Sequence, residues 1–232
     1  MTYFLVNPRF PDEFAKKMAR FGKILRAPEF SALEFPVSAH PDMQAANVGG
    51  KLFIHSENEA LAALLAENGI PFRRISARAG KLYPDDVALN LFTAKNFLFA
   101  NTKHASREVI AFAEANGFAP TYVKQGYAKC SSMLLGDAVV TADKGIYLTA
   151  TLRGIDALLI TPGGVGIEKY DTGFIGGASG ALCKGKTAVF GDILSHPDGE
   201  KILGFARTHG EEIISLGEGP LFDYGSIVRI DT

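Results

Sequence analysis

Lys129 and Cys130 form the pair best suited to nucleophilic chemistry in this sequence. The thiolate is the reactive form of cysteine, and a neighbouring ammonium group lowers the pKa of a thiol. His40 and Tyr127 are the candidates for proton transfer to or from such a nucleophile. Adjacent residues of a strand point to opposite faces, however. The alternative interpretation is therefore that Cys130 is a buried apolar residue that does not share a pocket with Lys129.

Acidic residues recur where predicted strands begin, together with amide and hydroxyl side chains. The residues expected to face a common pocket are Asp42, Gln44, Asp86, Asn90, Lys129, Asp171, Ser179 and Asp223. Crowded carboxylates raise one another's pKa unless a cation neutralises them, so a guanidinium or amine ligand suits this set. The alternative is that each aspartate bonds backbone N–H groups at a turn. Repetition favours neither interpretation, because duplicated units would inherit duplicated turn residues.

Motifs for metal and nucleotide sites are missing. No histidines or cysteines have the HxxxH, HExxH or CxxC spacing of a metal site. The glycine-rich stretches at 163–166 and 173–180 do not form a strand–GxGxxG–helix unit, and residues 177–180 lack the spacing of a Gly-x-Ser-x-Gly elbow. Cys183 precedes a turn in an apolar run and is expected to be buried. The sequence therefore predicts no metal and no cofactor.

Five predicted helices each end at a glycine that is followed by a short apolar strand. Their residue ranges are 14–22, 60–69, 109–117, 146–154 and 201–210. Glycine suits this position because the chain leaves a helix in the left-handed conformation. The glycines are Gly22, Gly69, Gly117, Gly154 and Gly210.

Four of these helices follow a predicted β-hairpin. The hairpin turns lie at Gly49-Gly50, at residues 94–96, at Gly136-Asp137 and at residues 184–186, between runs of strand-forming residues. Side-chain oxygens suited to capping stand near the helix starts, at Ser56, Ser106, Asp143 and Ser195. The repeated order is thus strand, strand, helix, strand.

The fifth unit is split between the chain ends. Residues 224–230 form a strand with no helix after it, and the chain begins with strand, helix and strand. We therefore predict one domain, 1–232, with units at approximately 37–76, 85–124, 125–161, 171–216, and 221–232 joined with 1–36. The predicted fold class is α/β: a five-bladed, pseudo-symmetric α/β propeller of ββαβ units whose fifth unit is closed by both termini. The alternative is an α/β sandwich with unrelated hairpins.

Composition and charge narrow the range of partners. The chain has 232 residues, 47% of them hydrophobic and 21% charged, with a net charge of −1. This balance argues against nucleic acid and membranes as partners, since such surfaces need clustered basic residues. Two cysteines and the absence of a signal-peptide pattern predict a cytoplasmic protein.

Two patches and the repeat give the chain a family resemblance. The sequence VFGDILSHPDGEKI at 189–202 resembles a strand–His-Pro–helix junction of translation initiation factor six, and FDYGSIVRIDT at 222–232 resembles its last strand. The whole chain resembles the pentein, or guanidino-modifying-enzyme (GME), superfamily, and is most similar to bacterial proteins of that fold without an assigned function. Enzymes of the superfamily use a cysteine in the last unit and a histidine before the third unit's strand. Residues 221–226 contain no cysteine, and Tyr127 stands where the histidine is expected, so a typical deiminase or amidinotransferase is not expected.

Two functions follow as hypotheses. The first is a polar, acidic central pocket for a small cationic or zwitterionic guanidino or amino ligand, in a binding protein or a divergent hydrolase that lacks the usual Cys/His pair. The second is a non-catalytic protein-interaction module of the same fold. A small polar molecule or a protein is thus the expected partner.

Overall fold

The computed structural model describes all 232 residues, and its strands form five three-stranded sheets of one topology together with one two-stranded sheet. In each three-stranded sheet, the central strand pairs antiparallel with one neighbour and parallel with the other. Four of the sheets are continuous in the chain: β3 (Ala45–Val48), β4 (Lys51–His55) and β5 (Phe72–Ile75); β6 (Phe92–Ala94), β7 (Phe97–Ala100) and β8 (Ala119–Tyr122); β9 (Ser132–Leu135), β10 (Ala138–Thr141) and β11 (Ala157–Leu159); β13 (Ser179–Cys183), β14 (Lys186–Val189) and β15 (Glu212–Ser215).

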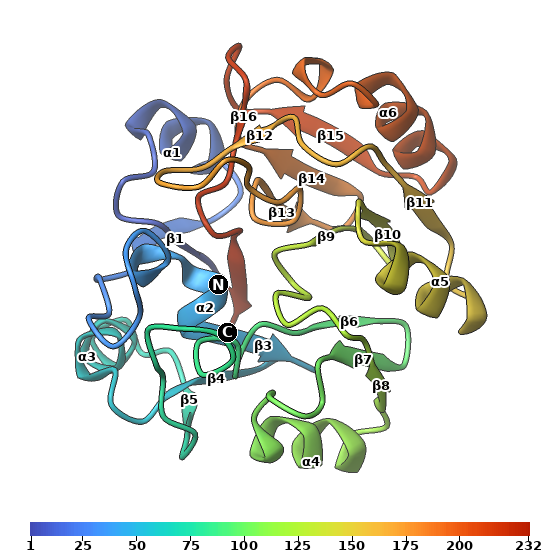
Figure 1. Ribbon diagram of the computed structural model, residues 1–232. Coiled ribbons are helices and arrows are strands. Elements are labelled where there is room, and N and C mark those ends of the chain that lie inside the picture. Colours follow the sequence, from blue (N-terminus) through green and yellow to red (C-terminus); the bar gives the residue numbers. More distant parts are fainter.

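A helix connects the two parallel strands of each of these sheets. These helices are α3 (Glu59–Glu67), α4 (Arg107–Ala115), α5 (Lys144–Leu152) and α6 (Gly199–Thr208). Figure 1 shows them at the periphery, with the sheets on their inner side. Each helix ends as predicted, because Gly69, Gly117, Gly154 and Gly210 all have positive φ angles between 66° and 84°.

The two ends of the chain share the fifth sheet. Strand β17 (Val228–Asp231) pairs antiparallel with β1 (Thr2–Val6), and β1 pairs parallel with β2 (Lys23–Arg26). Helix α1 (Asp12–Met18) connects β1 and β2. This sheet, called the terminal sheet below, therefore has the same strand order as the other four, although its first strand comes from the C-terminus.

Five apolar clusters connect neighbouring sheets. One joins the terminal sheet to β3–β5, and three further clusters join β3–β5 to β6–β8, β6–β8 to β9–β11, and β9–β11 to β13–β15. The fifth cluster, which contains Phe4, Phe10 and Phe190, joins β13–β15 back to the terminal sheet. Each three-stranded sheet therefore packs against two others through buried apolar side chains, and such burial is the main source of stability in a domain of this kind.

Several local predictions were wrong. Gly22 does not have a left-handed backbone, and its small size instead allows β1 to approach, since a Cβ there would lie 2.6 Å from the carbonyl oxygen of Thr2. Ser106 and Asp143 cap α4 and α5 as predicted, whereas the α3 cap is Asn58 and not Ser56. Ser195 lies too early to cap α6.

The segments that precede the first strands contain short elements that the repeat pattern does not predict. Residues expected to open the first strand of one unit form a helical turn instead. The additional elements are α2 (Pro41–Gln44), the 3-10 helices η1 (Val37–Ala39) and η2 (Ile193–Ser195), and the two-stranded sheet of β12 (Val165–Gly166) and β16 (Leu221–Phe222). Proline at the first helical position favours α2, because the missing N–H group would have no partner there.

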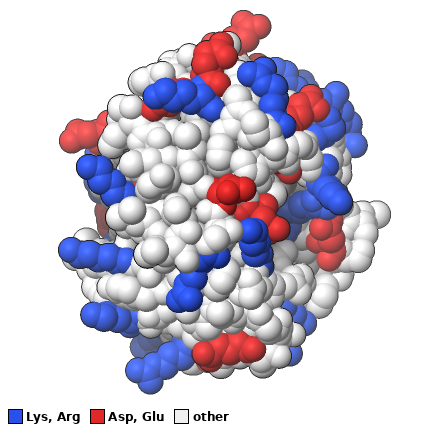
Figure 2. All heavy atoms as spheres, turned by 90° about the vertical axis from the view of Figure 1, so that its right-hand side faces the viewer, with Lys and Arg blue, Asp and Glu red and all other residues white.

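The surface carries charges of both signs. Figure 2 shows basic and acidic side chains interspersed over the face that carries α5. No helix is long and apolar enough to cross a bilayer.

Candidate functional site

A layer of buried polar side chains lies where the segments before the first strands meet, with a cavity on each side. The loop-side cavity, about 300 Å³, is lined by Glu34, Val37, His40, Met43, Lys81, Leu82, Tyr83, Asp86, Tyr127, Cys130, Ile167, Tyr170, Thr172, Phe174 and Asp223. The strand-side cavity, about 230 Å³, is lined by Asp42, Ala45, Ala46, Asn47, Leu91, Phe92, Thr93, Lys129, Leu134, Ser179, Gly180, Ala181, Ile227, Val228 and Arg229. The two cavities share no lining residue.

Asn90, Asp42 and Cys130 form the wall between the two cavities. The Asn90 amide oxygen accepts hydrogen bonds from the backbone N–H groups of Lys129 and Cys130, at 2.8 and 3.2 Å. Its amide nitrogen lies 2.9 Å from Cys130 Sγ, and Cys130 Sγ lies 3.2 Å from Asp42 Oδ2. All three residues are at most 4% exposed, so this wall is buried.

Lys129 and Cys130 face different cavities, although both lie in the turn that precedes β9 and not on a strand. Lys129 points into the strand-side cavity, where its Nζ donates to Ser226 Oγ at 2.8 Å, while Cys130 lines the loop-side cavity. Burial raises the pKa of the Cys130 thiol, and the negative charges of Asp42 and Asp223 raise it further. The predicted activation of Cys130 by Lys129 is therefore wrong, because the thiol acts as a hydrogen-bond donor to a carboxylate.

Two carboxylates and two other candidate residues meet in the loop-side cavity. Tyr127 donates to Asp86 Oδ2 at 2.7 Å, and Asp86 Oδ1 is buried without a hydrogen-bond partner. Burial raises the pKa of Asp86, which the hydrogen bond from Tyr127 partly opposes. Burial also raises the pKa of Asp223, whose Oδ1 lies 3.8 Å from His40 Nδ1. The cavity thus presents two carboxyl groups that a cation would stabilise in their ionised form.

Backbone contacts hold Asp223 in place. Its two carboxylate oxygens accept hydrogen bonds from the backbone N–H groups of Phe174 and Gly225, each at 2.9 Å. A Cβ at Gly177 would collide with the same carboxylate, so glycine is required there for close approach. This contact explains part of the glycine-rich stretch at 173–180.

Aromatic rings form much of the remaining loop-side wall. The rings of Tyr127 and Phe174 stack with centroids 6.2 Å apart, and Tyr83 lies 6.0 Å from Tyr127. Tyr83 is 49% exposed and Tyr170 is 48% exposed, so both reach the mouth of the cavity. Aromatic faces next to carboxylates are a favourable environment for an organic cation.

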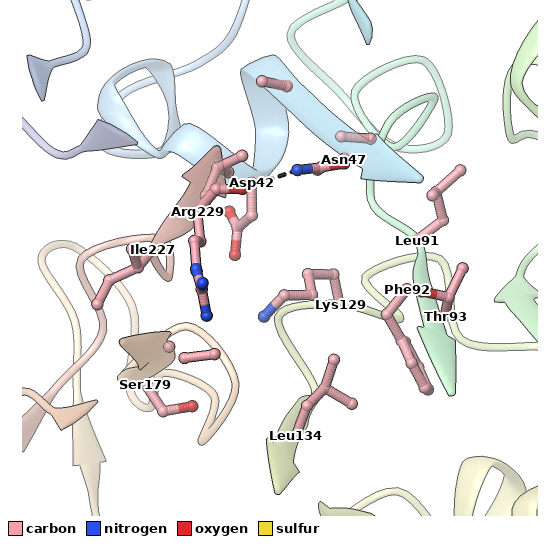
Figure 3. Close-up of a pocket in the computed structure, with 15 residues that line it drawn as sticks. Asp42, Asn47, Leu91, Phe92, Thr93, Lys129, Leu134, Ser179, Ile227 and Arg229 are labelled. Carbon is pink, nitrogen blue, oxygen red and sulfur yellow. Dashed lines mark hydrogen bonds between the residues drawn. The ribbon is translucent and has the colours of Figure 1, made fainter. Parts of the chain in front are cut away.

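The strand-side cavity has a different polarity. Figure 3 shows Asp42, Lys129 and Arg229 pointing into it from different segments of the chain, with Ser179 at its edge. Asp42 Oδ1 is buried and has no hydrogen-bond partner. Ser179 donates to the carbonyl oxygen of Gly176 at 3.3 Å. This cavity therefore combines the Arg229 guanidinium and the Lys129 amine, whose pKa is lowered by burial and raised by the charge of Asp42, with one carboxylate.

Three predicted pocket residues line neither cavity: Asn90, which lies in the wall between the cavities, and also Asp171 and Gln44. Asp171 is exposed. Its neighbours Tyr170 and Thr172 line the loop-side cavity, whereas Asp171 does not. Gln44 is fully buried and uses its amide internally, donating to the backbone oxygens of Pro28 and Ser38 and accepting from Asn58. The assignments of Asp171 and Gln44 were wrong in the same way: a polar residue near a strand opening need not face the centre.

Other residues of the two cavities were not predicted from the sequence. No sequence motif marks Arg229 on β17 or the aromatic residues Tyr83 and Phe174. The alternation of side chains along the C-terminal strand is the one signal that could have indicated Arg229. No group of three or more His, Cys, Asp or Glu side chains is arranged to hold a metal ion.

Comparison with solved structures identifies the fold. Over 98% of both chains, the fold is similar to dimethylarginine dimethylaminohydrolase in an adduct with 4-chloro-2-hydroxymethylpyridine, with a TM-score of 0.59 and 10% identity. It is also similar to SxtG, an amidinotransferase of the saxitoxin pathway from Microseira wollei, with a TM-score of 0.55 and 10% identity over 94% of this chain and 78% of that one. A mutant of dimethylarginine dimethylaminohydrolase from Pseudomonas aeruginosa, complexed with citrulline, gives a TM-score of 0.56 and 10% identity over 93% and 91% of the two chains. The chain therefore has the mixed α/β pentein fold.

The particular family follows from the sequence match. Residues 5–228 match the model of a family of unknown function, DUF6873, and the chain belongs to that family. No curated protein matches the sequence. The resemblance of two patches to translation initiation factor six stays a prediction.

Proposed function

We propose that the protein binds a small organic cation, a guanidino or amino compound, in the loop-side cavity. The observation that carries this proposal is the buried Oδ1 of Asp86, which lines the cavity and accepts no hydrogen bond. A buried carboxylate oxygen without a donor is costly, and a guanidinium or ammonium group would supply both the donor and the charge. Asp223, on the same cavity, is the second anionic contact.

The walls of the cavity support the same ligand class. Tyr83, Tyr127, Tyr170 and Phe174 line it together with the two aspartates. A cation close to an aromatic face is attracted to the ring, and the attraction grows when water is excluded. The raised pKa values of Asp86 and Asp223 mean that a bound cation would recover part of the free energy lost by burying these carboxyl groups.

Binding is favoured over thiol catalysis. A nucleophilic Cys130 would have to lose its proton next to Asp42 and Asp223, whose charges raise its pKa. The similar solved structures are named as a hydrolase of dimethylarginine and an amidinotransferase, and both names refer to guanidino compounds. That analogy supports the ligand class, whereas the reaction depends on side chains at the site.

A ring arrangement of the sheets would explain why one polar layer collects residues from distant segments. We propose that the five three-stranded sheets are the blades of a pseudo-symmetric propeller, closed by the pairing of β1 with β17. The closed cycle of apolar contacts between sheets supports it. The segments before the first strands would then converge on one axis.

A second function is favoured by the mouth of the loop-side cavity. Phe35, Leu82, Tyr83 and Tyr170 are between 45% and 75% exposed, and three of them line this cavity. Exposed apolar side chains that gather at one place often mark a protein contact. An interaction module in which a partner covers this mouth is therefore the second candidate.

The test of the cation site compares neighbouring aspartates. Calorimetric titration with agmatine, arginine and putrescine should detect binding of at least one of these compounds. Asp86→Asn should weaken that binding about 10- to 100-fold, since a hydrogen bond to a charged group is worth about 1.5–3 kcal/mol. The control is Asp85→Asn, because Asp85 is exposed and lines neither cavity. Equal binding by both variants, or no binding by the native protein, would refute the proposal.

A further inference from the structure

We infer that the strand-side cavity is a second binding site, for a small monocarboxylate that carries a hydrogen-bond donor on the adjacent carbon, such as a 2-hydroxy acid or a 2-amino acid. This inference stands apart from the cation site, because the two cavities share no lining residue. It depends on three features: two convergent cations, one buried carboxylate oxygen without a donor, and apolar walls.

Lys129 and Arg229 are the groups that would hold a carboxylate. Lys129 is half-buried and its Nζ donates to Ser226 Oγ at 2.8 Å. Burial lowers the pKa of this amine, while the charge of Asp42 raises it. In its ammonium form, which a bound carboxylate would favour, Lys129 has two further N–H donors for a ligand. Arg229 pairs with Asp231 at 3.0 Å, but Asp231 is 58% exposed and stands outside the cavity lining. A guanidinium has five N–H donors, so this pair leaves others available. Figure 3 shows both cations pointing into the cavity.

Asp42 favours a ligand that carries a hydrogen-bond donor in addition to its carboxylate. Its Oδ2 accepts from Cys130 Sγ at 3.2 Å, whereas its Oδ1 is buried and has no partner. The side chain is 1% exposed and points into the cavity (Figure 3). A carboxylate alone would be repelled by Asp42, but a hydroxyl or ammonium on the next carbon would satisfy Oδ1 while the carboxylate meets the cations. Phosphate and dicarboxylates fit less well, since a second negative charge would face Asp42.

The rest of the cavity suits a small apolar side chain. Leu91, Phe92, Leu134, Ile227 and Val228 form its apolar wall, within a volume of about 230 Å³. The cavity reaches solvent beside Ala181, which is exposed, and Arg229, whose side chain is 31% exposed. A branched four- or five-carbon acid could enter from this end and bury its alkyl group.

The test uses three acids of one shape: 2-hydroxy-3-methylbutyrate, valine, and 3-methylbutyrate, which lacks the donor. Calorimetry or ligand-observed NMR on the full chain should show binding of the hydroxy acid or of valine. The affinity for 3-methylbutyrate should be at least about tenfold lower. Arg229→Gln should weaken binding at least tenfold. Arg207→Gln, an exposed arginine on α6, should leave it unchanged.

Two further variants keep the outcome decisive. Ala181→Leu should block the mouth even if Arg229→Gln proves unstable in a melting experiment. Asp86→Asn, in the other cavity, should leave binding of the acids unchanged, so that failure of the cation site and failure of this site are distinguishable. Absence of binding at millimolar concentrations, equal binding of all three acids, or insensitivity to Arg229→Gln and Ala181→Leu would overturn the inference.

Discussion

Asn90 holds the wall between the two cavities, and its replacement by alanine should be strongly destabilising. Its side-chain oxygen accepts from two backbone N–H groups, those of Lys129 and Cys130. Its amide nitrogen contacts Cys130 Sγ and lies 3.3 Å from the backbone oxygen of Asp42. Because Asn90 is 1% exposed, water has little access to replace these interactions.

The magnitude follows from the groups left without partners. Each buried N–H group without an acceptor costs about 1–3 kcal/mol, so the two together cost about 4 kcal/mol in the middle of that range. For a chain of this length, 1 kcal/mol lowers the melting temperature by about 2–4 °C, which predicts a decrease of about 8–16 °C for Asn90→Ala.

The matched control is Asn116→Ala. Asn116 is exposed at the end of α4, and its side chain donates one hydrogen bond, to the carbonyl oxygen of Phe112 at 2.8 Å. Its loss should cost less than about 1 kcal/mol. Urea unfolding and calorimetry measure both variants against the native protein. If Asn90→Ala lowers the free energy of unfolding by no more than Asn116→Ala, the hydrogen-bonded wall is not what stabilises the centre.

Three other predictions follow from the same structure. Asp86 has a raised pKa in the folded state, so its ionisation favours unfolding at pH values above its unfolded-state pKa. Asp86→Asn should therefore raise the melting temperature at pH 7. This gain should disappear as the pH falls below the unfolded-state pKa of the aspartate. Cys183 is partly exposed, whereas Cys130 is 4% exposed and has a raised pKa. Cys183 should therefore react with a disulfide reagent at pH 8 much faster than Cys130. Cys183→Ser should remove this fast phase of the reaction. Deletion of residues 224–232 removes β17, the antiparallel partner of β1, and should abolish the cooperative melting transition; an unchanged transition would contradict the role of that strand.

The repeated strand order could be predicted from the sequence because each unit carries local signals. The helix-ending glycines at 69, 117, 154 and 210 require a left-handed backbone, and the turns at Gly49-Gly50 and Gly136-Asp137 separate strand-forming runs. These signals act over a few residues and do not depend on distant contacts. Gly22 shows the limit of the rule, because a close approach between strands also requires glycine and leaves the same letter in the sequence.

Side-chain direction at the centre could not be predicted in the same way. Asp42 and Gln44 are two residues apart on α2, yet one points into the strand-side cavity and the other bonds the backbone of residues 28 and 38. The difference depends on loop segments with no periodic pattern. Arg229 was missed because its neighbours predict only a closing strand, and its cavity exists only once the other sheets are in place.

The separation of Lys129 from Cys130 changes the chemistry that the centre supports. Had both side chains faced one cavity, the ammonium would have stabilised a thiolate. Instead Cys130 donates toward Asp42 and its pKa is raised, while Lys129 remains among hydroxyl and carboxylate oxygens on the other side. The thiol then serves to hold Asp42 Oδ2, which leaves Asp42 Oδ1 as the free acceptor in the strand-side cavity. The turn before β9, which directs these two neighbouring side chains to opposite sides, thus separates two cavities of different polarity. One is lined by carboxylates and aromatic rings, and the other by Lys129, Arg229 and a carboxylate.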